Sequence, residues 1–379
     1  MNYVQLKDVC VINMGQSPDS NSYNDCGEGL PFFQGNADFG EMYPVTRKWC
    51  SSPTKIASEN DILISVRAPI GALNYAKESC CIGRGLAALT PNKSKVSPAF
   101  IFWLLKSKNE ELNSKGTGST FKAIGRKVLE ETLIPNISLG EQIVCAKALE
   151  KIYYIMQTCQ QQLQKLDDLV KARFVEMFGE LHYNTHGFKI VSVEEVCTMV
   201  KDGTHQTPQY TTDDIHGFKF LSSKDVMSQK VDWKNIKYIS SELHEKLYST
   251  LKPQRDDILM SKNGVNYGVA AINDSDEVFD IYVSLALLRP KPIINPIYFR
   301  CVLNNPDTKE QFDSSIKGIG VPNLHLGEIK KTKILLPPIK LQNQFAAFVH
   351  QVDKSKVAVQ KSLDEAQLLF DSLMQQYFG

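Results

Sequence analysis

An internal repeat at about half the chain length is the feature that most constrains how this sequence can fold. Five short segments recur in the same order: VQLKDVC (4–10) as VSVEEVC (191–197), DILISVR (61–67) as DILMSKN (257–263), LAALTP (86–91) as LALLRP (285–290), GTGSTFKAIG (116–125) as GIGVPNLHLG (318–327), and LIPNISLGEQ (133–142) as LLPPIKLQNQ (335–344). The offset between partners grows from 187 to 202 residues. Five ordered matches predict a duplicated unit of about 180–200 residues.

The first part of each unit has the pattern of a mixed α/β domain. Short β-rich runs, such as ILISV (62–66) and VSLALLR (283–289), are separated by Gly, Pro, Asn and Asp turns. Ser97-Pro98 and Asn295-Pro296 each place an N-cap residue before a proline at the first helical position. The apolar runs that follow predict helices near 98–107 and 296–304.

The second part of each unit predicts a helix of about 40 residues, ~60 Å long. Ser138 and Glu141 form a capping box before the first helix, and Gly179 is its predicted end. Behind the box, apolar residues recur at spacings of four and three, typical of a heptad seam: Cys145, Leu149, Ile152, Met156, Cys159, Leu163, Leu166 and Val170. The second copy repeats the register with Phe345, Val349, Val352, Val359, Leu363, Ala366, Phe370, Leu373 and Tyr377, and Lys356 is its polar interruption.

Two such helices in one chain can bury their apolar stripes on each other; alternatively, each stripe packs on its own globular part. We favour the pair, with an interface of Leu149, Ile152, Met156, Leu163, Leu166, Val170, Val352, Val359, Leu363, Phe370 and Leu373. The predicted fold is α+β, with two mixed α/β domains related by a pseudo-twofold axis and joined by two long antiparallel helices in a coiled coil. The predicted boundaries are 1–138, 139–187, 188–340 and 341–379.

Two heads held apart by a stiff rod would act as a molecular ruler. DNA presents the same face every ~34–36 Å, so a rod of this length suits two half-sites one to two turns apart. Because the two copies differ in sequence, the half-sites that they read should differ as well.

The duplicated unit, the segments IPNISLGEQ and LPPIKLQNQ that open the long helices, and DGTHQTP (202–208) resemble the specificity subunit of type I restriction–modification enzymes. The resemblance covers both halves of the chain. Each copy departs from the family's helix opening: Asn136 replaces the second proline in the first, and Asn343 replaces the usual Glu in the second.

This resemblance implies two target-recognition domains, each reading one half of a bipartite double-stranded DNA target. It implies that the helices bind two adenine N6-methyltransferase subunits, with two restriction subunits as optional further partners. It also implies that S-adenosylmethionine and ATP bind to those partners, so that this chain is non-catalytic and carries no cofactor.

Composition excludes several other classes of protein. No stretch of 18 residues is apolar and free of charge, so we expect no membrane span. The N-terminus lacks a basic-then-apolar signal region, and the nine Cys include no CxxC pair, which favours free thiols in a bacterial or archaeal cytoplasm. The seven His have no metal-ligand spacing, so we expect no metal.

Sequence motifs that imitate catalytic sites have simpler explanations. Asn295-Pro296-Ile297-Tyr298 resembles the NPPY motif of adenine methyltransferases, but its counterpart in the first copy is Ser97-Pro98-Ala99-Phe100, so we interpret both as helix starts. The glycine-rich segments at 116–120 and 318–323 lack the Lys of a phosphate-binding loop, and remain either packing turns or phosphate contacts. Two alternatives stay open: a self-sufficient methyltransferase or nuclease, and a coiled-coil protein-interaction scaffold.

Base reading requires Arg or Lys for guanine and Asn or Gln for adenine. The candidate DNA-binding residues lie in or near polar turns after the predicted strands and before the predicted helices. They are Arg67, Arg84, Lys122, Arg126 and Lys127 in the first copy, and His205, Gln206, Lys224, Lys262, Asn263, Asn266, Lys317, Asn323 and His325 in the second. For any one of them, a solvated surface side chain is the alternative.

The charge balance limits how tightly such a chain could hold DNA by itself. Residues 1–138 carry 15 basic and 13 acidic residues, and residues 188–340 carry 20 and 19. Because non-specific affinity grows with the number of neutralised phosphates, we expect weak DNA binding without partner subunits.

Overall fold

The computed structural model describes residues 2–118, 122–316 and 322–379, which form two compact units. The first unit comprises 1–161 with 360–379, and the second comprises 162–359. The division cuts both long helices, α5 (Leu139–Phe178) and α11 (Ile339–Phe378), so each unit contains one globular head and half of each helix. We call residues 2–135 the first head and 189–336 the second head.

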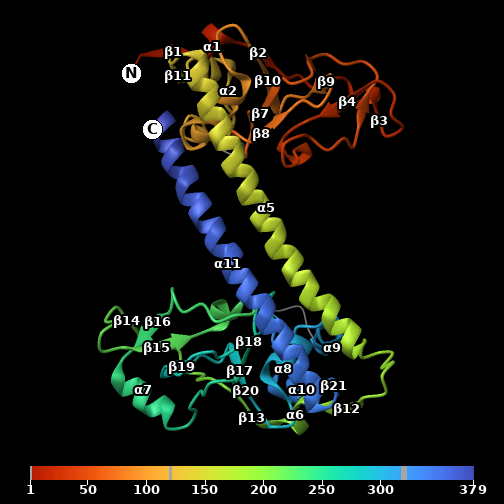
Figure 1. Ribbon diagram of the computed structural model, residues 1–379, viewed down its shortest axis with the longest axis vertical. Helices are drawn as coiled ribbons and strands as arrows, with labels where there is room; N and C mark the ends of the chain where they lie inside the picture. Colours follow the sequence, from red (N-terminus) through yellow and green to blue (C-terminus); the bar gives the residue numbers. More distant parts are fainter. Residues whose placement is uncertain (1, 119–121, 317–321) are drawn as a thin grey trace. The chain divides into compact units, whose positions relative to one another are not determined.

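Each head is built on a four-stranded antiparallel sheet, and the two sheets share one strand order (Figure 1). In the first head the order is β2 (Cys10–Met14), β10 (Leu86–Pro91), β7 (Ile62–Ser65) and β8 (Leu73–Tyr75). In the second it is β13 (Cys197–Asp202), β20 (Leu285–Pro290), β17 (Ile258–Ser261) and β18 (Ala270–Ile272). Strands β7 and β17 are buried along their whole length and mostly apolar, because both faces of the sheet are covered. The duplication predicted from the sequence is therefore confirmed in the heads.

Each head has a second sheet, and these second sheets differ more between the two heads than the four-stranded sheets do. In the first head it contains β3 (Tyr23–Asn24), β5 (Trp49–Cys50), β4 (Leu30–Phe33), β9 (Cys80–Ile82) and β6 (Ile56–Ala57). In the second head it contains β14 (Tyr210–Thr211), β16 (Lys237–Ile239), β15 (Phe218–Leu221) and β19 (Phe279–Ile281), with α7 (Ser241–Tyr248) packed on β19.

A two-stranded ribbon ties the start of each head to its end. In the first head β1 (Tyr3–Gln5) pairs with β11 (Leu133–Pro135), and in the second β12 (Lys189–Ser192) pairs with β21 (Lys333–Leu336). A four-residue helix follows the first strand of each ribbon: α1 (Leu6–Val9) and α6 (Val193–Val196). The chain thus enters the long helix from a strand anchored to its own head.

Two matched glutamines fix the position of each long helix. Gln142 Oε1 accepts the backbone N–H of Ser97 at 2.9 Å, and Gln342 Oε1 accepts that of Asn295 at 2.8 Å. Each side-chain amide also donates to the carbonyl five residues earlier, Ile137 or Pro337. Both glutamines are buried, so each ties a helix start to the head through polar groups that water cannot reach.

These contacts correct the register of the last two repeat segments. The predicted offset of 202 aligns Gln142 with Gln344, whereas the structure matches it with Gln342, at an offset of 200. The strand pairings Val4–Ile134 and Val191–Ile334 give the same offset for the ribbon. The predicted alignment was wrong because LIP (133–135) and LLP (335–337) both consist of two apolar residues and a proline. Aligning the two prolines therefore gave an offset that is too large by two residues.

The predicted helices are confirmed, and Ser97 and Asn295 occupy the N-cap positions, but only the Asn295 side chain makes a capping hydrogen bond. Helices α2 (Pro98–Ser107) and α8 (Pro296–Leu303) begin at the predicted prolines, and the Asn295 side chain accepts the N–H of Ile297 at 2.9 Å. Asn295 and Pro296 thus start a helix, as interpreted from the sequence. The remaining helices are α3 (Asn109–Ser114), α4 (Arg126–Glu130), α9 (Pro306–Ser315) and α10 (Leu326–Lys331).

Both long helices have 40 residues, and α11 begins two residues before the predicted boundary at 341. The capping box is present: Glu141 accepts the Ser138 N–H at 2.9 Å, and Glu141 N donates to Ser138 Oγ at 3.3 Å. The helix ends before Gly179, whose φ of 70° lies in the left-handed region that favours glycine.

The long helices pack on each other within each unit, and the pairing is antiparallel. In the first unit Tyr153 of α5 meets Phe370 of α11, with ring centroids 6.4 Å apart. In the second unit Phe174 of α5 meets Phe345 of α11 at 5.6 Å. The heads join the same cores, because Trp103 contacts Phe370. The apolar stripe of each long helix therefore packs both on the other long helix and on a head, so both arrangements considered from the sequence are present.

The predicted interface residues differ in how deeply they are buried. Leu149, Ile152, Met156, Val352 and Phe370 are buried. Six further interface residues are half-buried: Leu163, Leu166, Val170, Val359, Leu363 and Leu373. Full burial is thus concentrated where a head covers the seam.

Candidate nucleic-acid interface

The turn that follows the central strand of the first head brings two predicted residues together. After β7, Ile124 N donates to Val66 O at 2.9 Å, and Ala68 N donates to Lys122 O at 3.0 Å. Arg67 lies between these two bonds in a bridge to Ala123, and both Arg67 and Lys122 are exposed. Residues some 55 positions apart in sequence therefore present cations at one edge of the sheet.

A basic cleft of about 650 Å³ opens beside this turn. Its charged and amide side chains come from four chain segments: Gln34, Asn36, Asp38, Arg47, Lys48, Arg67 and Arg84. Gly85 allows two of these segments to meet, because a Cβ at that position would lie 2.3 Å from the carbonyl oxygen of Gln34. With four cations and one carboxylate, the cleft has the charge that a nucleic-acid backbone requires.

Sequence reasoning placed Arg67 and Arg84 here but missed the neighbouring Arg47, Lys48, Gln34 and Asn36. Arg47 is anchored by donating to Ala37 O at 3.0 Å, which holds the loop in shape. The available signal was the polar segment QGN after an apolar strand, followed by a second cationic pair in TRK.

The structure does not bring Arg126 and Lys127 into the cleft lining. Arg126 donates to the backbone carbonyl of Ile12 and so anchors α4 against β2. Lys127 is strongly exposed, with Glu131 3.7 Å away one helical turn later. Arg126 thus has a packing role, and Lys127 is exposed outside the cleft lining.

The second head repeats the turn with different side chains. Leu324 N donates to Lys262 O at 2.8 Å, and Asn263 bridges Asn323. Asn263 therefore stands where the first head has Arg67, and Asn323 where it has Ala123. The Asn263 Oδ1 atom is buried and has no hydrogen-bond partner among the described residues. Amides thus replace an arginine at the same point of the scaffold.

Lys262 differs from the exposed base-reading side chain that the sequence predicted. It is 5% exposed, and its ammonium lies 2.9 Å from Asp202 Oδ2. His205, which is exposed, lies 3.3 Å from the same oxygen through Nε2. Lys262 therefore serves to hold Asp202, and Asp202 in turn orients His205.

The electrostatics of Asp202 agree with this arrangement. Burial raises the pKa of Asp202, but the hydrogen bond and charge of Lys262, together with the charge of His205, outweigh burial and lower it below its usual value. The carboxylate is therefore ionised at neutral pH. A further consequence is that no free cation stands at the Lys262 position.

The loop that carries His205 depends on a glycine with no room for a side chain. A Cβ on Gly203 would lie 2.0 Å from the carbonyl oxygen of Ile281, and Gly15 in the first head is in the same situation with Gly83. This close approach ends β13 and lets His205 and the exposed Gln206 project beyond the sheet. Glycine is therefore required at this position of the DGTHQTP motif because no side chain would fit.

The remaining predicted residues of the second head that the structure describes are exposed. Asn266, Asn323 and His325 are exposed, and His325 is the N-cap of α10. Lys224 is exposed and lies 3.7 Å from Asp225. Its neighbour Ser223 is joined to the Lys262 turn through Ser284. Lys317 lies outside the described residues.

The described residues contain neither a candidate metal site nor a helix suited to cross a membrane. Among residues 2–118, 122–316 and 322–379, no group of three or more His, Cys, Asp or Glu side chains could hold a metal ion. Within the same ranges, the search for a helix long and apolar enough to cross a membrane found none.

The family of the chain follows from comparison with known proteins. The family described as "Type I restriction modification DNA specificity domain" matches residues 1–167 and again residues 186–366. The chain therefore belongs to this family, and the two matches coincide with the two copies of the duplicated unit. Chains of this family are DNA-recognition components rather than catalysts, and neither alternative considered from the sequence gains support.

Relatives with curated descriptions agree. A putative type I restriction enzyme MjaX specificity subunit of Methanocaldococcus jannaschii is 43% identical over 160 residues, which is 42% of this chain and 38% of that relative. The EcoBI specificity subunit of Escherichia coli is 20% identical over 98% of this chain and 83% of its own length. The similarity of highest identity thus covers less than half of either protein, whereas the longer match is much more divergent.

Solved structures show the same fold. The S subunit of a type I restriction-modification system from M. genitalium superposes with a TM-score of 0.64, at 16% identity, over 100% of this chain and 96% of that one. A chain from a study of type I complex assembly and conformational transition gives 0.55 at 17% identity, covering 100% and 97%.

Proposed function

We propose that this chain is the specificity subunit of a type I restriction–modification complex. It recognises a bipartite double-stranded DNA target, one half with each head, and positions two adenine N6-methyltransferase subunits. Restriction subunits are optional further partners. S-adenosylmethionine and ATP bind to those other subunits, and the proposed DNA target implies action in the cytoplasm of a bacterium or archaeon.

The observation that carries this proposal is the matched turn after β7 and β17. The backbone hydrogen bonds are the same in both heads, but Arg67 and Ala123 in one correspond to Asn263 and Asn323 in the other. Arginine pairs with guanine and asparagine with adenine in the major groove. One scaffold that presents unlike base-reading groups is what two unlike half-sites require.

Contact with DNA would begin at the cations. Arg47, Lys48 and Lys122 suit phosphate contacts that fix the position of the first head, and Arg67 and Arg84 suit base edges. In the second head, the exposed side chains of His205, which Asp202 holds, and of Asn323 supply the equivalent groups, with Asn263 bridged to Asn323 beside them. The base to be methylated is then turned out of the stack into a partner's active site.

Methylome sequencing of cells with and without the gene for this chain tests the proposal. The expected result is loss of adenine methylation at one bipartite motif when the chain is absent. Unchanged methylation, with the neighbouring methyltransferase expressed, would contradict the proposal.

A further inference from the structure

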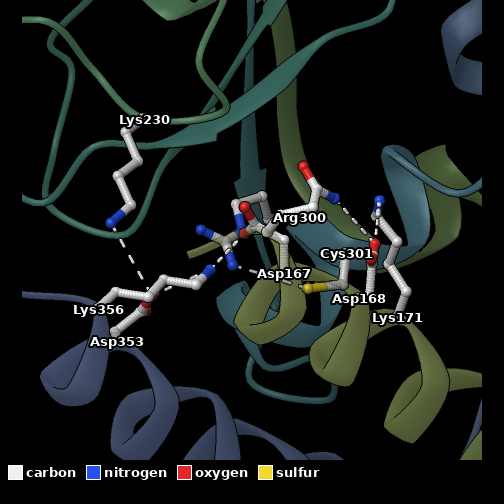
Figure 2. Close-up of polar contacts among 9 residues, drawn as sticks. Asp167, Asp168, Lys171, Lys230, Arg300, Cys301, Asp353 and Lys356 are labelled. Carbon is white, nitrogen blue, oxygen red and sulfur yellow. Dashed lines mark hydrogen bonds and ion pairs between the residues drawn. The ribbon is translucent and has the colours of Figure 1, made fainter. Parts of the chain in front are cut away.

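The second unit contains a charged pocket of about 390 Å³ where its head meets both long helices. Figure 2 shows the charged side chains of its lining, which are Asp167 and Lys171 from α5, Asp353 and Lys356 from α11, Arg300 from α8, and Lys230 from a loop of the head. Val170, Phe174 and Val349 supply apolar wall. All of these residues belong to the second unit.

The pocket has more cations than its carboxylates can neutralise. Lys356 lies 2.5 Å from Asp167 and 4.0 Å from Asp353, and Lys230 lies 3.9 Å from Asp353. Both carboxylates therefore face lysines. Lys171 faces Asp168, which is outside the lining, at 3.3 Å. Counting Asp168, four cations face three carboxylates, which leaves an excess of one positive charge.

Arg300 is the cation without a carboxylate partner among the described residues. Its Nη2 reaches only the sulfur of Cys301, at 3.7 Å, and its buried Nε has no hydrogen-bond partner. A buried donor without a partner is unfavourable, because it has lost its hydrogen bonds to water. A guanidinium in this state is suited to an oxyanion, which it can bind with two parallel hydrogen bonds.

The first unit shows that the fold does not require this pocket. Helix α2 matches α8 from their first prolines, so Phe102 and Trp103 correspond to Arg300 and Cys301. On the long helices, Tyr153 and Phe370 correspond to Asp353 and Val170. In the first unit Trp103 packs against Phe102, Tyr153 and Phe370 with ring centroids 5.3–5.6 Å apart. Smaller and charged side chains replace that aromatic cluster in the second unit.

We propose that this pocket binds a small anion that carries a phosphate or carboxylate on an apolar body. Arg300 binds the oxyanion, Lys230 and Lys356 flank it, and Phe174 and Val349 contact the apolar part. The volume is at the lower end of the range for small-molecule sites, which combine apolar walls with a few polar groups. The site is distinct from the proposed DNA interface and does not depend on it.

Calorimetric titration of the full chain with 1-naphthyl phosphate, 1-naphthoate and neutral 1-naphthol tests the proposal. The expected result is saturable one-site binding of at least one anion and none of naphthol; the two anions distinguish phosphate from carboxylate. Arg300→Met keeps the apolar stem and should weaken binding at least about tenfold, since hydrogen bonds to charged groups are lost. Cys301→Trp, which introduces the residue of the first unit, should close the pocket and abolish binding.

Lys115→Met is the control. Lys115 lies in the first unit, outside this lining, and is paired with Glu111 at 2.6 Å, so its replacement should leave the affinity unchanged. Circular dichroism shows which variants are folded, and either Arg300→Met or Cys301→Trp suffices for the test. The proposal is overturned if neither anion binds saturably to the wild-type chain, or if a folded variant of either kind binds as tightly as wild type.

Discussion

The aspartate before the central strand occupies the same position in both heads, but its side chain pairs with a different residue in each. In the first head Asp61 accepts from Thr90 Oγ1 at 2.7 Å and from Ser58 N at 2.8 Å. In the second head Asp257 accepts the N–H of Gln254 in the same way, but its other partner is Arg289, through two bonds of 2.8 and 2.7 Å. The backbone contact is the same in both heads, and the side-chain partner is free to change.

The head–helix junctions extend this comparison to the core. In the first unit the junction is aromatic around Trp103, and in the second it is a charged pocket around Arg300. Backbone geometry is thus conserved between the copies, whereas the means of stabilisation is not. Each prediction below asks whether a pair of matched positions behaves alike or differently.

The largest expected difference is between Trp103→Ala and Cys301→Ala. Removal of a fully buried tryptophan should destabilise the first unit by about 3–5 kcal/mol. The matched cysteine beside the pocket should have an effect of about 1 kcal/mol or less, because few packed atoms are lost. Urea unfolding of the full chain measures both values. Equal effects would contradict the view that the two junctions are stabilised differently.

The glutamine pair should instead behave alike. Gln142→Leu and Gln342→Leu each leave a backbone N–H and backbone carbonyls without their partner, so each should lower the free energy of unfolding by about 1–3 kcal/mol. Gln160→Leu, at an exposed position of α5, is the control and should change it by about 0.5 kcal/mol or less. If only one of the two substitutions lowered the free energy of unfolding, the two matched glutamines would not contribute equally to stability, which would contradict the prediction.

The contribution of the buried Lys262–Asp202 pair to the pH dependence of stability should have no counterpart at the matched position of the first head. Lys262 lowers the pKa of Asp202, so this carboxylate contributes stability above its usual pKa of about 4, and the contribution is lost as pH falls through the lowered value. Asp202→Asn should therefore make unfolding less sensitive to pH between about pH 5 and pH 2. The first head has Met14 at the matched place in its sheet, and Met14→Leu should leave the pH profile as in wild type. Identical pH profiles of Asp202→Asn and wild type would exclude the role assigned to Lys262.

The smallest expected effect belongs to Lys127. It lies outside the cleft lining, so Lys127→Ala should weaken DNA binding by the assembled complex about equally for all sequences and lower the salt slope by about one. A salt titration of binding to specific and non-specific duplexes measures this. A change in sequence preference would instead place Lys127 among the base-reading residues.

Much of the fold could be predicted because its signals are local. The prolines at 98 and 296, the Ser138–Glu141 box and the heptad seam each depend on neighbours within one or two helical turns. The pairing of Lys262 with Asp202 could not be predicted, because 60 residues separate them and a buried lysine has the same sequence pattern as an exposed one. Likewise, Arg47 and Lys48 join the cleft through backbone contacts with the segment 32–38: Arg47 donates to Ala37 O at 3.0 Å, and Phe32 N donates to Lys48 O at 2.9 Å.

The most direct test of the central claim is the methylome of the double variant Arg67→Ala/Arg84→Ala, expressed with its methyltransferase partner. Both side chains line the first cleft, and loss of a base-reading pair should relax specificity by about 1–3 kcal/mol per position. The account predicts a degenerate first half of the methylated motif with an unchanged second half, and the reverse for Asn263→Ala/Asn323→Ala. If either variant altered both halves, or if neither altered any base, the claim that each head reads its own half-site would be contradicted.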